Sequence, residues 1–158
     1  MEFIVKKYYN IEGMIRNGFK LSRDYHSLDF SYAKISDDAM LALAKSRSVK
    51  QVRRLIITGK KLTAISAQAL AESNCLPNLE SLKLYKNKIG DEGVKYLAET
   101  DKLPNIKTLR FAWNDIGPEG ARSLAESSQL GGLTSLALSE NHIGDDGLKY
   151  LAEAKSFS

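Results

Sequence analysis

The sequence predicts an α/β solenoid, with short parallel strands in one layer and helices in the other. A unit of 27 residues recurs five times along the 158-residue chain. Early in each unit, apolar residues alternate as on a half-buried strand. Later in each unit they follow the i, i+3, i+4 spacing of a helix face. One unit cannot bury both apolar faces alone, so we expect the units to stack on a continuous core.

The units follow an N-terminal segment, residues 1–24, and occupy residues 25–51, 52–78, 79–105, 106–132 and 133–158. We number the places in a unit from 1 to 27. Places 6, 11 and 19 are apolar in every unit, place 4 is always leucine and place 20 is always alanine. The leucines are Leu28, Leu55, Leu82, Leu109 and Leu136, and the alanines are Ala44, Ala71, Ala98, Ala125 and Ala152. Columns this regular indicate a structural repeat.

The stretch NKIGDEG, residues 87–93, looks chemical because two acids lie between two glycines. These acids occupy places 13 and 14, where the helix of the unit is expected to begin. Carboxylates there are favoured by the helix dipole and the unpaired N–H groups, and Pro118 suits the same first turn. A calcium loop needs ligands at alternating places and a closing glutamate. The acids therefore indicate helix starts, and we expect no metal or cofactor here.

The pattern LxxLxLxxNxIGxxGxxxLA resembles the leucine-rich repeat, in its ribonuclease-inhibitor-like class, over residues 25–158. The resemblance implies a curved solenoid with strands on the concave side and helices on the convex side. It also implies that the place 9 asparagines, Asn87, Asn114 and Asn141, form a ladder of hydrogen bonds along the stack. Units 1 and 2 depart from this pattern, with Ala33 and Lys60 at place 9.

Residues 1–24 form no repeat, and we expect them to be a cap over the open end of the core. An amphipathic segment for a partner or membrane is the alternative, which Gly13 and Gly18 weaken. At the other end, the fifth unit closes without a polar cap. Either further repeats follow in the natural protein, or this end associates with a second chain.

Composition excludes several classes of protein. No apolar run approaches the roughly 20 residues that cross a bilayer, and the N-terminus lacks the order of a secretory signal. A single cysteine, Cys75, excludes a disulfide framework. A cytoplasmic setting fits, or delivery into a host cytosol if the protein is a bacterial effector, a hypothesis that rests only on the short, irregular array. The net charge of +4 is a mild excess.

No enzyme signature is present. His26 and His142 occupy unrelated places, so they favour solvent-facing positions over catalysis or zinc binding. Cys75 lies near an apolar return turn and is expected to be partly buried. TGKKLT, residues 58–63, lacks the first glycine of a phosphate loop. We therefore expect no catalytic residues.

The strand places that do not enter the core carry basic and aromatic residues. Because equal places stack about 5 Å apart, Lys83 should lie beside Arg110 and Lys86 beside Trp113. The convex side carries glutamate at place 21 in four units, and Tyr32 lies at the margin of the basic face. The expected partner-binding residues are Arg53, Arg54, Lys83, Tyr85, Lys86, Lys107, Arg110 and Trp113.

These residues indicate a non-enzymatic protein-interaction module that binds an acidic partner on a basic, aromatic concave face. Lysines on exposed strands also discourage edge association, but that does not explain an exposed tryptophan. Two alternatives stay open. Some proteins of this repeat class activate small GTPases, although no motif for that activity is found here. Nucleic acid is disfavoured, because three units offer few phosphate contacts.

Overall fold

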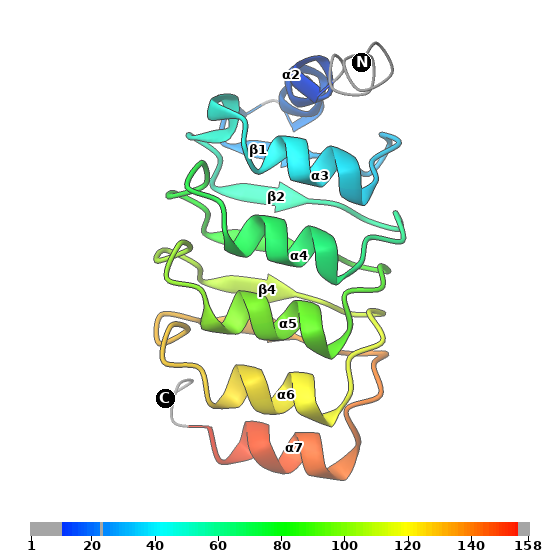
Figure 1. Ribbon diagram of the computed structural model, residues 1–158, viewed down its shortest axis with the longest axis vertical. Helices are drawn as coiled ribbons and strands as arrows, with labels where there is room; N and C mark the ends of the chain where they lie inside the picture. The colour runs from blue at the N-terminus through cyan, green and yellow to red at the C-terminus, as the bar shows by residue number, and fades with distance from the viewer. Residues whose placement is uncertain (1–10, 23, 155–158) are drawn as a thin grey trace.

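Five short strands form one parallel sheet in chain order, as Figure 1 shows for the whole array. The computed structural model describes residues 11–22 and 24–154. The strands are β1 (Ser27–Asp29), β2 (Arg54–Ile56), β3 (Ser81–Lys83), β4 (Thr108–Arg110) and β5 (Ser135–Ala137). Each pairs with the next at a register of 27 residues. The predicted strand–turn–helix unit and its period are confirmed.

The helices line up along the opposite side of the core. They are α3 (Asp37–Leu43), α4 (Ala64–Ala71), α5 (Gly90–Glu99), α6 (Pro118–Ala125) and α7 (Gly144–Ala152), with a 3₁₀ turn η1 (Arg47–Val49) in the first return. The leucines of place 4 are fully buried in the first four units, and Leu136 is half-buried in the fifth. The expected arrangement, with strands on the concave face and helices on the convex face, is confirmed.

The asparagine ladder exists where the sequence carries it. The Asn87 amide donates to the carbonyl of Ile57 in the preceding unit at 3.0 Å, and its oxygen accepts from the backbone N–H of Lys60 and Leu62. Asn114 donates in the same way to Leu84 at 2.7 Å. Because the side chain satisfies backbone groups of two units at once, it fixes their spacing.

Lys60 partly replaces the missing asparagine of the second unit. Its ammonium group reaches back one unit and donates to the backbone carbonyl of Ser31 at 2.7 Å. At place 9 of the second unit, one side-chain hydrogen bond to the preceding unit is therefore kept although the asparagine is absent.

The turn that joins the strand to the helix has two geometries, which alternate from one unit to the next. In the second and fourth units, place 10 has a positive φ, at Lys61 (58°) and Asp115 (56°), and the helix N-cap is extended. In the third and fifth units the positive φ moves to place 12, at Gly90 and Gly144 (both 63°). Over the second to fifth units these turns therefore repeat every 54 residues, whereas the first unit has no positive φ at either place.

The glycines of place 15 set how closely the helices approach. A Cβ atom on Gly93 would lie 3.1 Å from the Cα of Ala64 and 2.6 Å from a methyl group of Ile89. Gly120 and Gly147 have equally tight surroundings in the next two units. Adjacent helices therefore pack nearly backbone to backbone along this part of the array.

An N-terminal helix, α2 (Ile11–Ser22), lies against β1 at the first end of the sheet. Ile15 is 1% exposed, and a Cβ on Gly18 would lie only 2.6 Å from Leu28. The helix continues through both glycines, so Gly18 serves close packing. Phe3, Tyr8 and Tyr9, which belong to the expected cap, lie outside the described residues.

At the last unit the core is less covered. Leu136, Leu138 and Leu151 are half-buried and Leu148 is 60% exposed. Self-association at this end stays a prediction. Among the described residues, no helix is long and apolar enough to cross a membrane.

Candidate binding face

The concave face is built from the strand residues that turn away from the core. The backbone register aligns Lys83 with Arg110, and both lie at the fifth place of their units. Lys86 donates its N–H to the carbonyl of Ala112 at 2.9 Å, which sets Lys86 beside Trp113. Both neighbour relations expected from the repeat are confirmed. The fold thus brings cations and the tryptophan of adjacent units into one surface.

The aromatic side chains on this surface are accessible. Trp113 is 47% exposed and Tyr85 is 42% exposed, whereas Tyr32, at the margin, is 89% exposed. Large apolar rings in water are unfavourable unless they are covered by a partner. Trp113 and Tyr85 are half-covered by the array, which orients them while leaving one side free.

Trp113 occupies a left-handed backbone position. Its φ is 60°, and the same place has φ values of 67° at Gly59, 56° at Lys86 and 56° at Glu140. The turn after the strand imposes this conformation on four consecutive units. A side chain there costs roughly 1 kcal/mol relative to glycine. Trp113 therefore lowers stability locally, as Lys86 and Glu140 do at the same place.

Two of the eight expected residues are already engaged within the protein. Arg53 pairs with Glu80 at 3.5 Å. Arg54 donates to the hydroxyl of Ser27 at 2.6 Å and forms an ion pair with Asp24. The backbone N–H of His26, the Ser27 hydroxyl and Arg54 together hold the pKa of the Asp24 carboxyl below its ordinary value. Arg54 thus ties the first two units together at the edge of the face.

The other cations stay available. Lys86, Lys107 and Arg110 are exposed and Lys83 is half-buried. Within the described residues, none of these four has an ion-pair partner. The candidate binding face is therefore centred on the third and fourth units and includes these four cations, Tyr85 and Trp113.

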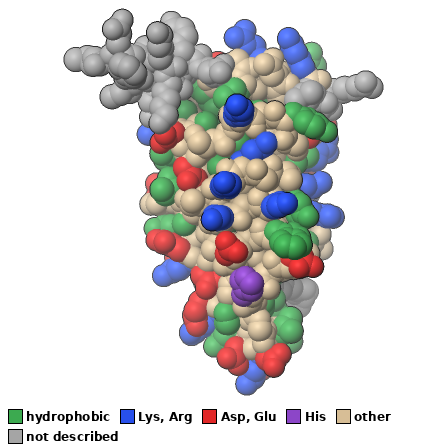
Figure 2. Space-filling model, turned by 90° about the vertical axis from the view of Figure 1, so that its right-hand side faces the viewer, with side chains coloured by type: hydrophobic (Ala, Val, Ile, Leu, Met, Phe, Trp, Pro, Cys, Tyr) green, Lys and Arg blue, Asp and Glu red, His purple; other side chains and the backbone are tan. Residues whose placement is uncertain are grey.

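The loops after the strands carry further lysines that the sequence analysis did not include. Lys34, Lys61 and Lys88 share place 10 in the first three units and are exposed. Figure 2 views the array from this edge and shows basic side chains grouped over its middle, with acidic ones below and to one side. The 27-residue period could have revealed this column, because the lysines recur at one place.

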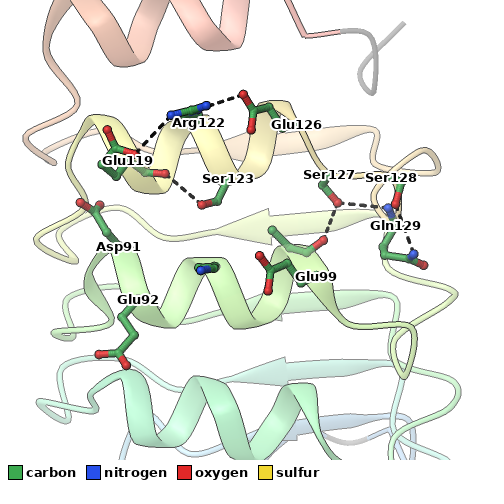
Figure 3. Close-up of a pocket in the computed structure, with 12 residues that line it drawn as sticks. Asp91, Glu92, Glu99, Glu119, Arg122, Ser123, Glu126, Ser127, Ser128 and Gln129 are labelled. Atoms are coloured by element: carbon green, nitrogen blue, oxygen red, sulfur yellow. Dashed lines mark hydrogen bonds and ion pairs between the residues drawn. The ribbon is translucent and has the colours of Figure 1, made fainter.

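The convex side has the opposite character. An open cleft of about 660 Å³ lies between α5 and α6 (Figure 3). Arg122 bridges Glu126 at 2.9 Å and Glu119 at 4.0 Å, which raises the pKa of Arg122. The acidic residues that line the cleft are Asp91, Glu92, Glu99, Glu119 and Glu126. Lys95 and Arg122 also line the cleft, so its acidic side chains outnumber the basic ones by five to two.

The acids at place 13 have a structural role that reaches beyond their own helix. The Asp37 carboxylate accepts hydrogen bonds from the backbone N–H and hydroxyl of Thr63, which caps α4, and from the Ser66 hydroxyl. Asp91 accepts from the N–H of Gly117, the N-cap of α6, at 2.6 Å. We expected these acids to start their own helices, and they also cap the next one.

The remaining candidates for chemistry lie apart. Both histidines are exposed, and Cys75 is half-buried, as expected. No group of three or more histidine, cysteine or acidic side chains in the described ranges has the geometry of a metal site.

Comparison with protein families gives one match. A model described as Leucine Rich repeat matches residues 26–44, 75–98, 102–125 and 133–152, which together make up more than half of the chain. The chain belongs to the leucine-rich repeat family. The matched segments leave out most of the second repeat, where Lys60 stands in place of the ladder asparagine.

Among solved structures, the leucine-rich repeat array is similar to the tropomodulin C-terminal domain of Caenorhabditis elegans. The TM-score is 0.66 at 14% identity, over 94% of this chain and 92% of that chain. At this identity the likeness shows the fold alone. No match was found among curated protein sequences.

Family membership supports a protein-interaction module in general. Domains of this family are typically non-enzymatic. The repeat places many side chains on a broad surface at fixed spacing, and such a surface suits contact with another macromolecule.

Proposed function

We propose that this leucine-rich repeat array binds an acidic protein segment on its concave face. The observation that carries the proposal is the position of Trp113, which is half-exposed and beside Lys86 in the sheet register. Aromatic side chains next to cations are typical anchors of protein interfaces. Tyr85, Lys83, Lys107 and Arg110 extend the same surface.

Charge supports the choice of an acidic partner. The four available cations lie on neighbouring strands, so their potentials add over one surface. A negative segment would approach faster and with the correct face, and this steering would weaken with salt. Arg53 and Arg54 already neutralise Glu80 and Asp24, so they are proposed as the border of the contact.

The experiment uses Trp113, the only tryptophan, as the reporter. A twelve-residue peptide with glutamates on both sides of two central leucines is titrated into the protein while its fluorescence is followed. We expect saturable binding that Arg110→Glu weakens at least tenfold. Lys149→Glu, the same charge change on the exposed side of α7, should leave the affinity within about twofold.

A single-stranded oligonucleotide of equal charge is the competing probe. If it displaces the peptide at an equal or lower concentration, with a steep dependence on salt, the face binds nucleic acid and the proposal is wrong. If Arg110→Glu and Lys149→Glu have equal effects, the contact does not lie on the concave face.

A further inference from the structure

Along the edge formed by the loops after the strands, the charge of the side chains changes from positive to negative around Trp113. In consecutive repeats, place 8 is Lys86, Trp113 and Glu140, so the ring lies between a cation and an anion. The N–H of Trp113 donates to the carbonyl of Ser139 at 3.1 Å, which sets Trp113 beside Glu140 in the register. All three residues are exposed.

The backbone presents these three side chains in the same way. Their φ values are 56°, 60° and 56°, so each leaves the loop from the same left-handed conformation. Adjacent strands are about 4.8 Å apart, which separates the outer two backbones by roughly 10 Å across the tryptophan. Place 10 becomes acidic in the fourth repeat, at Asp115, and place 8 becomes acidic in the fifth, at Glu140.

The flanking residues extend both signs. On the side of the first repeats lie the exposed cations Lys61 and Lys88, and no acid occupies place 8 or 10 there. Beyond Lys88, place 10 becomes Asp115 and then His142. In Figure 2 the basic side chains gather over the middle of this edge, and the acidic ones lie mainly below and to one side of them.

We infer that the partner segment is bipolar: acidic where it crosses the third repeat, apolar on Trp113, and basic where it reaches Glu140. The inference rests on the proposed function and adds a direction to it. A uniformly acidic segment would bring its end against Glu140 and Asp115, where like charges repel. A segment with a basic residue about 10 Å from its acidic one would pair with both sides of the ring.

The arrangement also gives specificity. Exposed ion pairs contribute little affinity, up to about fivefold each, but a wrong sign at either end is unfavourable. The array would thus distinguish segments of equal composition by the spatial order of their charges around the apolar residue.

The test uses three synthetic peptides with the same two central leucines. One has acidic residues on both flanks, one has basic residues on both flanks, and the third is acidic on one flank and basic on the other. We expect wild-type protein to bind the bipolar peptide about threefold to tenfold more tightly than the acidic peptide, and the basic peptide most weakly.

A charge reversal at one residue provides the decisive comparison. Glu140→Lys should reverse the order, so that the acidic peptide binds more tightly than the bipolar one. Glu153→Lys makes the same change in net charge on the helix side of the same repeat and should keep the wild-type order.

The outcomes separate the two proposals. If the acidic peptide equals or exceeds the bipolar one on wild-type protein, and Glu140→Lys changes neither, the bipolar partner is wrong. The concave-face function still stands in that case, provided that Arg110→Glu weakens the acidic peptide. If Arg110→Glu weakens neither peptide, the function itself is wrong.

Discussion

The carboxylate of Asp91 accepts a hydrogen bond from the backbone N–H of Gly117 at 2.6 Å, so an acid at the start of one helix caps the start of the next. Asp91 is the acid that lies between two glycines and looks chemical in the sequence. Its partner is a backbone group 26 residues away. The structure therefore gives this acid a role in joining repeats.

Replacing Asp91 with alanine tests that role. The N–H of Gly117 would lose its acceptor, and we expect a loss of about 1 kcal/mol in the free energy of unfolding, as for other N-cap acceptors. Asp145→Ala is the matched control, because Asp145 has the same place in the last repeat and no hydrogen-bond partner among the described residues. Urea denaturation should show a smaller loss for the control; equal losses would contradict the capping role.

Trp113 allows stability and binding to be separated. Both Trp113→Ala and Trp113→Gly remove the ring and should abolish the heat of peptide binding in isothermal titration calorimetry. Because φ is 60°, glycine should be the more stable of the two variants by about 1 kcal/mol in thermal unfolding. If alanine is as stable as glycine, the residue is not held in the left-handed region.

The ladder predicts a large effect at one asparagine. Asn114 is fully buried and donates to the carbonyls of Leu84, Phe111 and Ala112. Asn114→Ala removes these three bonds and the side-chain acceptor of the Ile89 N–H. Each carbonyl keeps a second donor, so we expect a loss of about 1 to 3 kcal/mol in unfolding free energy. Asn141→Ala should lose less, because Asn141 is half-buried at the open end. The reverse order would show that the ladder is not the source of stability.

The loss of folding stability at acidic pH should depend on Asp37. Burial raises the pKa of its carboxyl, but hydrogen bonds from Ser66 and Thr63 outweigh burial and hold the pKa below 3.8. A lowered pKa in the folded state means that the stabilisation is complete above pH 3.8 and is lost as the pH falls through the lower value. Asp37→Asn should therefore be less stable than wild type at pH 7 and closer to it at pH 2.5, measured by denaturant midpoints. A constant difference across this range would exclude the linkage.

We propose that α2 serves as the N-terminal cap expected for residues 1–24. Ile15 is 1% exposed against the first repeat, and Glu12 accepts from Ser46 at 2.5 Å and Ser48 at 2.6 Å. Ile15→Ala should cost about 2 to 4 kcal/mol. Hydrogen exchange should speed up in β1 before β4. Uniform acceleration along the array would argue against a cap.

Much of the fold could be predicted, because the hydrophobic effect acts on every repeat alike. Leu82 and Ile89 occupy places 4 and 11 of the third unit, and both are buried. Apolar residues recur at these two places in all five units, so the requirement for burial appears five times in the sequence. The alignment of Lys83 with Arg110 follows from the same period. A register error of one residue would have turned every strand leucine of place 4 away from the core.

The parts that could not be predicted depend on contacts outside the period. Asp24 lies in the N-terminal segment, so no column pairs it with Arg54. The sign of φ at place 12 is equally hard to predict from the sequence. Gly90 has a φ of 63°, whereas Gly117, at the same place, has a φ of −101°. The same residue type fits both turns, so its identity does not predict the sign of φ.

The 54-residue alternation of turns has a consequence for making such arrays longer. We call the contact between two consecutive repeats a joint. Asp37 and Asp91 provide a capping carboxylate at the first and third joints, whereas Ala64 and Pro118 occupy the same place at the second and fourth. A glycine packs on the backbone of the preceding helix at the second, third and fourth joints alike, so the capping carboxylate is what distinguishes them. A single copied repeat would place two joints of one kind in succession. An engineered extension should therefore duplicate repeats in pairs.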